Sequence, residues 1–263
     1  IVQLAADHPG FNDPEYRRRR NEIAQVALKY HGGPVPRVDY TEEEQGVWRE
    51  VRERLEPLHA RYACREYLEA FSRIGLSRTE IPQLADVNAV LEPFHGFRML
   101  PVAGLVSSKT FLGYLGRSAF LSTQYMRHHS VPLYTPEPDV IHELVGHAAT
   151  FAHPDFTRLN KAFGQAIPRA VDDEAVERIA RLYWYTMEFG VTEEAGKLKV
   201  FGAGLLSSFG ELGRFETEET LRPFDVEEVV ETPYDPTQYQ AVLFKSSSFE
   251  AMASDVTAWL ERF

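Results

Sequence analysis

Cysteine, basic charge and long hydrophobic runs are all scarce in this sequence of 263 residues. The single cysteine, Cys64, excludes an intramolecular disulfide, and its apolar and aromatic neighbours predict a buried side chain. Neither a signal peptide nor the run of ~20 apolar residues that a membrane helix needs is present. These absences predict a soluble protein that is not exported and that works in a reducing cytoplasm.

Basic side chains are outnumbered, because 28 lysines and arginines stand against 39 aspartates and glutamates, for a formal net charge of -11. A nucleic-acid partner is therefore not expected, since phosphate binding needs a clustered basic face. The one basic run, residues 17–20, is flanked by Glu15 and Glu22 and is interpreted as a solvated or salt-bridged helix face. The charge balance favours a small-molecule partner.

Hydrophobic patterns predict a mainly α chain with minor β structure. With 44% hydrophobic residues the chain can bury a full core, and no repeat or linker divides it, so one domain over residues 1–263 is expected, with an N-terminal tail over 1–7. A capping box at Thr41 and Glu44 opens one helix. Other helices are predicted over residues 15–30, 62–74, 82–91, 137–149, 173–189 and 248–263.

Short strands and irregular segments fill the rest of the predicted fold. Residues 191–201 read as a hairpin that turns near Gly196, and residues 226–230 and 241–244 as further strands. Residues 101–116, 122–134 and 202–213 are rich in glycine, serine and aromatics and punctuated by turns. Chain of this kind usually carries the functional site.

Two histidines, His142 and His147, lie close together near a predicted helix start, in the segment YTPEPDVIHELVGH that begins at Tyr134. Their spacing is one residue longer than that of the zinc proteases, and on an ideal helix it separates the two side chains by about 140°. Joint metal binding would require Gly146 to loosen the turn or the metal to lie between two flanks. The spacing alone is equally consistent with one histidine that caps or packs and one that is exposed.

A third ligand would distinguish these readings, and Glu188 is the candidate. It ends a helix otherwise striped with apolar side chains and lies one turn beyond Trp184. Two histidines and one carboxylate form the facial triad of iron(II) oxygenases, which leaves open positions on the metal. An exposed glutamate at a helix end is the alternative. A zinc hydrolase with Glu143 as general base is a further alternative, against which the extra residue between the histidines speaks.

From about residue 8 to the C-terminus the sequence resembles the aromatic amino acid hydroxylases, the family of phenylalanine, tyrosine and tryptophan hydroxylases. The resemblance covers nearly the entire chain. It is carried by residues 8–11 (HPGF), 81–84 (IPQL), 96–98 (GFR), 101–105 (PVAGL), 123–125 (TQY), 134–139 (YTPEPD), 142–147 (HELVGH), 188–190 (EFG) and 202–212 (GAGLLSSFGEL).

The resemblance implies a helical basket around a non-haem iron site, with tetrahydropterin as the electron donor and dioxygen as co-substrate. It implies that iron(II) is held by His142, His147 and Glu188. The implied pterin site consists of Gly104, Val106, Ser108, Phe111, Glu143 and Tyr183. The implied amino acid site consists of Arg127 on the carboxylate, with Tyr134, Thr135, Pro138, Trp184 and Ser207 around it; Glu143 and Tyr134 are the implied catalytic residues.

Phenylalanine is the expected substrate and tyrosine the alternative, with para or meta hydroxylation left open. Trp184 stands where phenylalanine and tyrosine hydroxylases carry tryptophan, whereas Pro236, in the segment over residues 234–239, matches neither specificity pattern. Leu121 stands where animal members place a histidine beside the pterin, so that hydrogen bond is not expected. A structural ion pair between Arg20 and Glu137 is also suggested by their positions in the family.

The remaining expectations concern assembly and the class of protein. No regulatory or tetramerisation domain is recognised, which predicts a monomer. The alternative outside enzymology is a sensor that binds an aromatic amino acid without turnover. Such a sensor would bind ligand stoichiometrically and oxidise no pterin.

Overall fold

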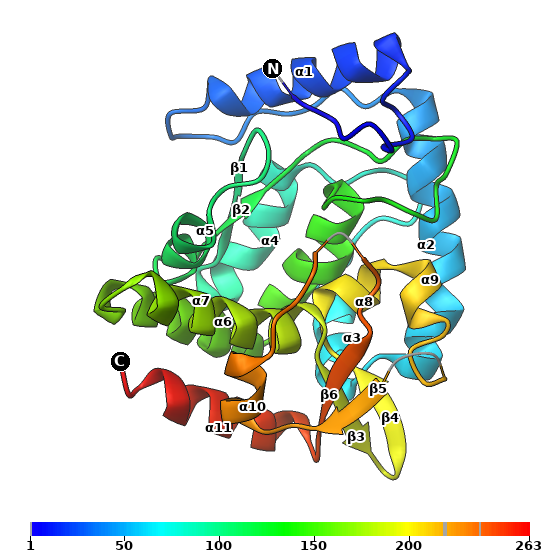
Figure 1. Ribbon diagram of the computed structural model, residues 1–263. Coiled ribbons are helices and arrows are strands. Elements are labelled where there is room, and N and C mark those ends of the chain that lie inside the picture. Colours follow the sequence, from blue (N-terminus) through cyan, green and yellow to red (C-terminus); the bar gives the residue numbers. More distant parts are fainter. Residues whose placement is uncertain (1, 218–219, 237) are drawn as a thin grey trace.

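Helices make up most of the structure, and they surround the central segment that carries His142 and His147 (Figure 1). The computed structural model describes residues 2–217, 220–236 and 238–263. Its mainly α composition with small sheets confirms the predicted fold class. Cys64 is fully buried in the core, as predicted.

The first half of the chain forms a helical scaffold. The capping box at Thr41 and Glu44 is present, with each side chain bonded to the other residue's backbone N–H. Left-handed glycines, Gly75 and Gly96, end the third and fourth helices, since residues with a Cβ rarely adopt this conformation. These helices are α1 (Pro14–Leu28), α2 (Glu42–Tyr62), α3 (Arg65–Ile74) and α4 (Leu84–His95).

Shorter elements connect the scaffold to the central segment. Two strands pair in parallel, and a helix capped by Ser107 lies between them in the chain. The elements are β1 (Arg98–Pro101), α5 (Ser108–Leu115) and β2 (Ala119–Ser122).

The two helices predicted over residues 137–149 and 173–189 are not regular α-helices throughout. The first begins later than predicted and is π-helical, and the second changes from α to π geometry in its last turn. The elements are η1 (His142–His147), η2 (Ala148–Ala152), α6 (Pro154–Ala166), η3 (Ile167–Arg169), α7 (Asp173–Tyr183) and η4 (Trp184–Glu188).

A four-stranded sheet lies at the end of the molecule opposite α1, with strand order β4-β3-β6-β5 (Figure 1). The predicted hairpin turns at Ala195 and Gly196, both with positive φ. The elements of this half are β3 (Val191–Glu194), β4 (Lys197–Val200), α8 (Ala203–Ser207), α9 (Phe209–Leu212), β5 (Thr220–Pro223), α10 (Val226–Glu231), β6 (Val242–Ser246) and α11 (Phe249–Leu260).

The strand predicted over residues 226–230 is wrong, because this segment is the helix α10. Its valines favour a strand, but Asp225 caps the helix by accepting from the backbone N–H of Glu228. Val229 and Val230 then share one buried face while the glutamates face solvent. Capping and burial outweigh the weak β preference of a six-residue segment.

The core packs directly behind η1. Phe97 and Phe151 stack with ring centroids 4.2 Å apart. The hydroxyl of Tyr67 on α3 donates to the carbonyl of Val145, at 2.9 Å. This bond satisfies a carbonyl of the wide π turn and ties η1 to the scaffold. None of the helices in the described ranges is long and apolar enough to cross a membrane.

Candidate active site

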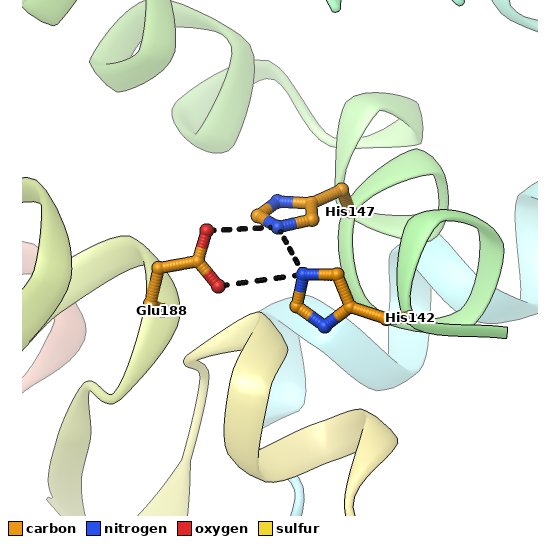
Figure 2. A group of neighbouring side chains, drawn as sticks. All are labelled: His142, His147 and Glu188. Atoms are coloured by element: carbon orange, nitrogen blue, oxygen red, sulfur yellow. Dashed lines mark hydrogen bonds and ion pairs between the residues drawn. The ribbon is translucent and has the colours of Figure 1, made fainter. Parts of the chain in front are cut away.

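The π geometry of η1 brings His142 and His147 together. In a π-helix the backbone bonds join residues five apart, so side chains five apart lie on the same face. The two Nε2 atoms are 3.0 Å apart and point to the same space (Figure 2). The separation of about 140° expected on an ideal α-helix is thus removed by the widening of the turn.

Gly146 allows a close approach at this turn, which differs from the loosening role considered from sequence. A Cβ at Gly146 would lie 2.8 Å from the backbone oxygen of Ala203 on α8. Side chains essentially never approach backbone so closely, so only glycine lets α8 pack here. The contact matters because α8 carries Ser207, which bonds to His142.

Ser207 fixes the tautomer of His142. The serine hydroxyl donates to the carbonyl of Ala203 at 2.8 Å, so it accepts the N–H of His142 Nδ1 at 2.9 Å. The Nε2 of His142 therefore presents a lone pair to the shared space. Ser207, which was expected to contact the substrate, lines a cavity beside His142, and its hydroxyl is bonded to the imidazole.

Glu188 completes the group from η4 (Figure 2). Its Oε1 lies 2.9 Å from His147 Nε2, and its Oε2 lies 3.6 Å from His142 Nε2. One ligand atom from each of the three residues lies within 4.8 Å of the others. Two imidazole nitrogens and one carboxylate at this separation can hold a divalent metal on one face.

Burial and mutual charge set the protonation of the three groups. Burial lowers the pKa of His142 to about 4, which keeps this imidazole neutral. Burial disfavours the charged forms of His147 and Glu188 too, but their attraction is stronger, so the pKa of His147 is raised and that of Glu188 is lowered. The site therefore stabilises a positive charge beside Glu188, which is what a bound cation supplies.

Glu143 lies next to the first histidine and faces a cavity on one side of the group. Its Oε1 accepts from the backbone N–H and the hydroxyl of Thr123, at 3.0 and 2.9 Å. Burial raises the pKa of Glu143 to about 7, although His147 and Thr123 favour the carboxylate. This cavity is lined by all the residues predicted for the pterin: Gly104, Val106, Ser108, Phe111, Glu143 and Tyr183.

Aromatic rings shape this first cavity. Phe111 meets Tyr183 edge to face, with centroids 5.6 Å apart, and Phe120 packs on the ring of His147 at 4.5 Å. The hydroxyl of Tyr183 is bonded to Asn160 Oδ1 at 3.2 Å. Leu121 also lines the cavity and contributes only apolar surface. The walls suit a flat ring whose polar edge faces Glu143.

A second cavity also adjoins His142 and Glu188. It is lined by all the residues predicted for the amino acid: Arg127, Tyr134, Thr135, Pro138, Trp184 and Ser207.

Arg127 in this second cavity is paired with a buried carboxylate. Its Nε and one Nη donate to the two oxygens of Asp139, at 2.8 and 2.9 Å, and Asp139 also accepts from the N–H of His142 at 3.1 Å. Burial opposes ionisation of Asp139, but the Arg127 guanidinium outweighs it and lowers the pKa of the carboxyl. The pair holds the guanidinium at the cavity wall in one orientation.

Trp184 forms the wall shared by the two cavities. Its ring stacks on Tyr234 at a centroid distance of 4.3 Å and an angle of 15°, and it also contacts Phe189 at 4.8 Å. The indole N–H donates to Oε1 of Gln240 at 2.8 Å. Pro236, in the segment that was expected to influence specificity, lines the second cavity; residue 237 lies outside the described residues.

The ion pair suggested for Arg20 and Glu137 is present, with Nη1 and Oε1 2.8 Å apart. The Arg20 guanidinium also lies 3.3 Å from the ring centroid of Tyr125. His8 is buried and lies 3.5 Å from the same carboxylate, and its Nδ1 accepts from the backbone N–H of Gly10 at 2.9 Å. This cluster joins α1 to the segment that lines the second cavity.

Three contributors were missed by sequence reasoning: Thr123, Asp139 and Gln240. Asp139 could have been found, because an acidic residue three positions before His142 is a helix-capping signal. Thr123 and Gln240 carry no local signal. Thr123 bonds to Glu143 and Gln240 bonds to Trp184, and each partner is at least twenty positions away in the sequence, so only the tertiary fold brings the two residues together.

The similarity to known proteins extends over nearly all of this chain. A family model described as "Biopterin-dependent aromatic amino acid hydroxylase" matches residues 2–263. The human tyrosine 3-monooxygenase is 44% identical over 265 residues, covering 98% of this chain and 50% of the relative. The human phenylalanine-4-hydroxylase is 44% identical over 254 residues, covering 94% and 56%. The chain thus spans about half the length of these curated relatives.

Solved structures with the same architecture include bacterial phenylalanine hydroxylases. That of Chromobacterium violaceum, with bound iron(III) and 7,8-dihydrobiopterin, superposes with a TM-score of 0.80 at 27% identity, covering 91% of this chain and 90% of that one. The apo enzyme of Colwellia psychrerythraea gives a TM-score of 0.77 at 28% identity, covering 89% and 92%.

Proposed function

Because the chain belongs to the biopterin-dependent aromatic amino acid hydroxylases, we propose that it hydroxylates the ring of phenylalanine, using iron(II), tetrahydropterin and dioxygen. The observation that carries this proposal is the convergence of His142, His147 and Glu188 on one point between two cavities. One cavity suits the pterin and the other suits the amino acid, and both would adjoin a metal held by these residues.

The three side chains fit iron(II). His142, His147 and Glu188 would hold the metal, because two imidazole nitrogens and one carboxylate are the ligand set of non-haem iron(II) oxygenases. Ser207 holds the tautomer in which His142 Nε2 is the free donor. When bound, the metal and the pterin together would supply the oxygen activation that protein side chains cannot provide. The chain itself would position the reactants and exclude water.

In the first cavity, Phe111 would contact the face of the pterin and Glu143 its polar edge. Thr123 occupies Oε1 of Glu143 with two donors. Oε2 would then accept from the N–H groups of the ring. Gly104, Val106, Ser108 and Tyr183 would complete the walls of this cavity.

In the second cavity, Arg127 would bind the carboxylate of the amino acid. Asp139 takes the Nε edge of the guanidinium, and the carbonyl of Pro132 accepts from Nη1 at 3.4 Å. One N–H on each Nη would therefore remain for the substrate. Tyr134, at 42% exposure, stands at the mouth and would help to enclose the reacting ring. Thr135, Pro138 and Trp184 would surround the rest of the substrate.

Phenylalanine is proposed over tyrosine because apolar side chains form part of the lining of the second cavity. Pro138 and Trp184 line the second cavity beside His142, and Pro236 faces the same space. Tyrosine hydroxylation is the second candidate, since the human tyrosine and phenylalanine enzymes are equally similar to this chain, at 44% identity.

The test is product analysis on protein loaded anaerobically with ferrous iron. Tetrahydropterin, oxygen and phenylalanine, tyrosine or tryptophan would be added, and products identified by mass spectrometry. Glu188→Gln and His142→Gln should retain the fold and lose both stoichiometric iron and product. His31→Gln, at an exposed position outside both cavities, is the matched control and should behave as wild type.

One oxygen gained by phenylalanine in preference to tyrosine would support the proposal. A preference for tyrosine would refute phenylalanine as the substrate and support the second candidate, tyrosine hydroxylation. Stoichiometric binding of iron and amino acid without oxidation of the pterin would refute hydroxylation and leave a sensor.

A further inference from the structure

Gln240 is a buried amide beneath an exposed loop at the mouth of the second cavity. Its residue exposure is 6%, whereas the neighbouring residues 235, 236, 238 and 239 are all exposed. Buried amides are stable only when their donors and acceptors are satisfied. The bonds of Gln240 therefore show what this side chain holds in place.

One end of the amide contacts the shared wall of the two cavities. The carbonyl oxygen, Oε1, accepts the indole N–H of Trp184 at 2.8 Å. An indole has a single donor, so this bond fixes which way the ring is turned about its side-chain axis. Stacking on Tyr234 alone would allow the ring to slide within its plane.

The other end of the amide holds the loop. Nε2 donates to the carbonyl of Asp235 at 3.1 Å and to the carbonyl of Gln238 at 3.0 Å. The backbone N–H of Gln240 is itself anchored on Oε1 of Glu211 at 3.2 Å. The side chain of Gln240 thus connects Asp235 and Gln238 of the loop to the indole of Trp184.

We propose that Gln240 is a positioning residue for amino acid selectivity, because it sets the distance between Trp184 and the loop that carries Pro236 and Tyr239. Pro236, Gln238 and Tyr239 line the second cavity, which Trp184, His142 and Glu188 also line. A shift of the loop relative to the indole changes the width available to a substrate ring. This inference rests on the proposed hydroxylase function and concerns the substrate side of the site.

Two substitutions separate the two ends of the amide. Gln240→Leu keeps the approximate size and removes every side-chain bond. Gln240→Glu keeps an acceptor for the indole N–H but replaces the donor to the loop by an oxygen that faces two carbonyls. Gln83→Leu is the matched control, because the Gln83 amide also makes two bonds to backbone, both with Val38, and lines neither cavity.

Selectivity is measured on the iron-loaded enzyme with tetrahydropterin and oxygen. In Gln240→Leu, kcat/KM for phenylalanine should fall at least tenfold, mainly through KM, and the ratio of kcat/KM for phenylalanine to that for tyrosine should change at least threefold. The yield of product per pterin oxidised should fall with it, because a misplaced ring is attacked less efficiently. Gln83→Leu should lower thermal stability and leave these ratios within twofold of wild type.

Tryptophan fluorescence gives a reading that does not depend on turnover. The emission of Trp184, taken as the difference from Trp184→Phe, should shift in Gln240→Leu and stay near wild type in Gln240→Glu. In the Trp184→Phe background, Gln240→Leu should change selectivity less than it does in wild type, because the partner is already absent.

The outcomes distinguish the two levels of the proposal. An active wild type in which Gln240→Leu folds and keeps its phenylalanine-to-tyrosine ratio and its Trp184 emission would overturn the role of Gln240 alone. A wild type that hydroxylates none of the three amino acids would overturn the proposed function, and this inference with it.

Discussion

Replacing Asp139 by asparagine should destabilise the protein far more than the same change at a surface ion pair. The side chains of Asp139 and Arg127 are 0% and 2% exposed, and two hydrogen bonds join them. Asparagine keeps the shape but leaves the guanidinium charge uncompensated. Breaking a buried pair in this way costs roughly 3–5 kcal/mol. One amide oxygen still accepts, so we expect about 3 kcal/mol, or roughly 6–12 °C in Tm for a chain of this size.

The assay is unfolding by heat and by urea, with Asp86→Asn as the control. Asp86 pairs with Arg37 on the surface, where the two side chains are 57% and 62% exposed. Its loss should change the free energy of unfolding by less than about 1 kcal/mol. If Asp139→Asn were no more destabilising than Asp86→Asn, the argument that burial makes this pair costly to break would be refuted.

Three further predictions follow from buried groups near the site. His59 is bonded to the carbonyl of Leu206, and burial lowers its pKa from 6.5 to about 4, so between these pH values the unfolded chain binds a proton that the folded chain does not. From pH 7 to pH 4 the free energy of unfolding should therefore fall by about 3 kcal/mol more in wild type than in His59→Gln. Urea titrations that give the same pH dependence for both proteins would contradict this. Gly146→Ala should lower the free energy of unfolding in urea by about 1–3 kcal/mol, because the added Cβ forces α8 away. It should also weaken iron binding, measured by competition with a chelator. Unchanged iron affinity would show that α8 does not position His142. Arg127→Lys should raise KM for phenylalanine at least tenfold with a smaller change in kcat, because the lysine ammonium lacks the planar guanidinium that can bind Asp139 and a substrate carboxylate together. An unchanged KM would show that Arg127 does not bind the substrate.

Local signals predicted most of the fold. The capping box at Thr41 and the glycine turn at residue 196 are decided by a few neighbouring residues, and both are confirmed. The strand predicted over residues 226–230 was wrong because the valines and glutamates of this segment fit a strand or a helix equally well. Burial against the rest of the molecule decides between the two structures. Short segments depend on tertiary contacts more than long ones do.

The positions of the proposed site residues can be compared with the structure, and their geometry was not predicted. The residues proposed for each role line one of the two cavities, yet the spacing of His142 and His147 was difficult to reconcile with an α-helix. Periodicity assumes one helix type, so it cannot reveal a π turn. Thr123 bonds to Glu143 and Gln240 bonds to Trp184 only because the tertiary fold brings distant parts of the chain together, which no local sequence pattern predicts.

The wide turn at residues 142–147 also bears on how metal sites are recognised and redesigned. A π turn can arise when an α-helix accepts one extra residue without changing its two ends. Deleting Leu144 would shorten the spacing to the one that α-helices use for zinc, with both imidazoles still on one face. Histidine spacing therefore defines a ligand pair only together with the pitch of its helix, and a search that fixes the spacing at four will pass over sites built like this one.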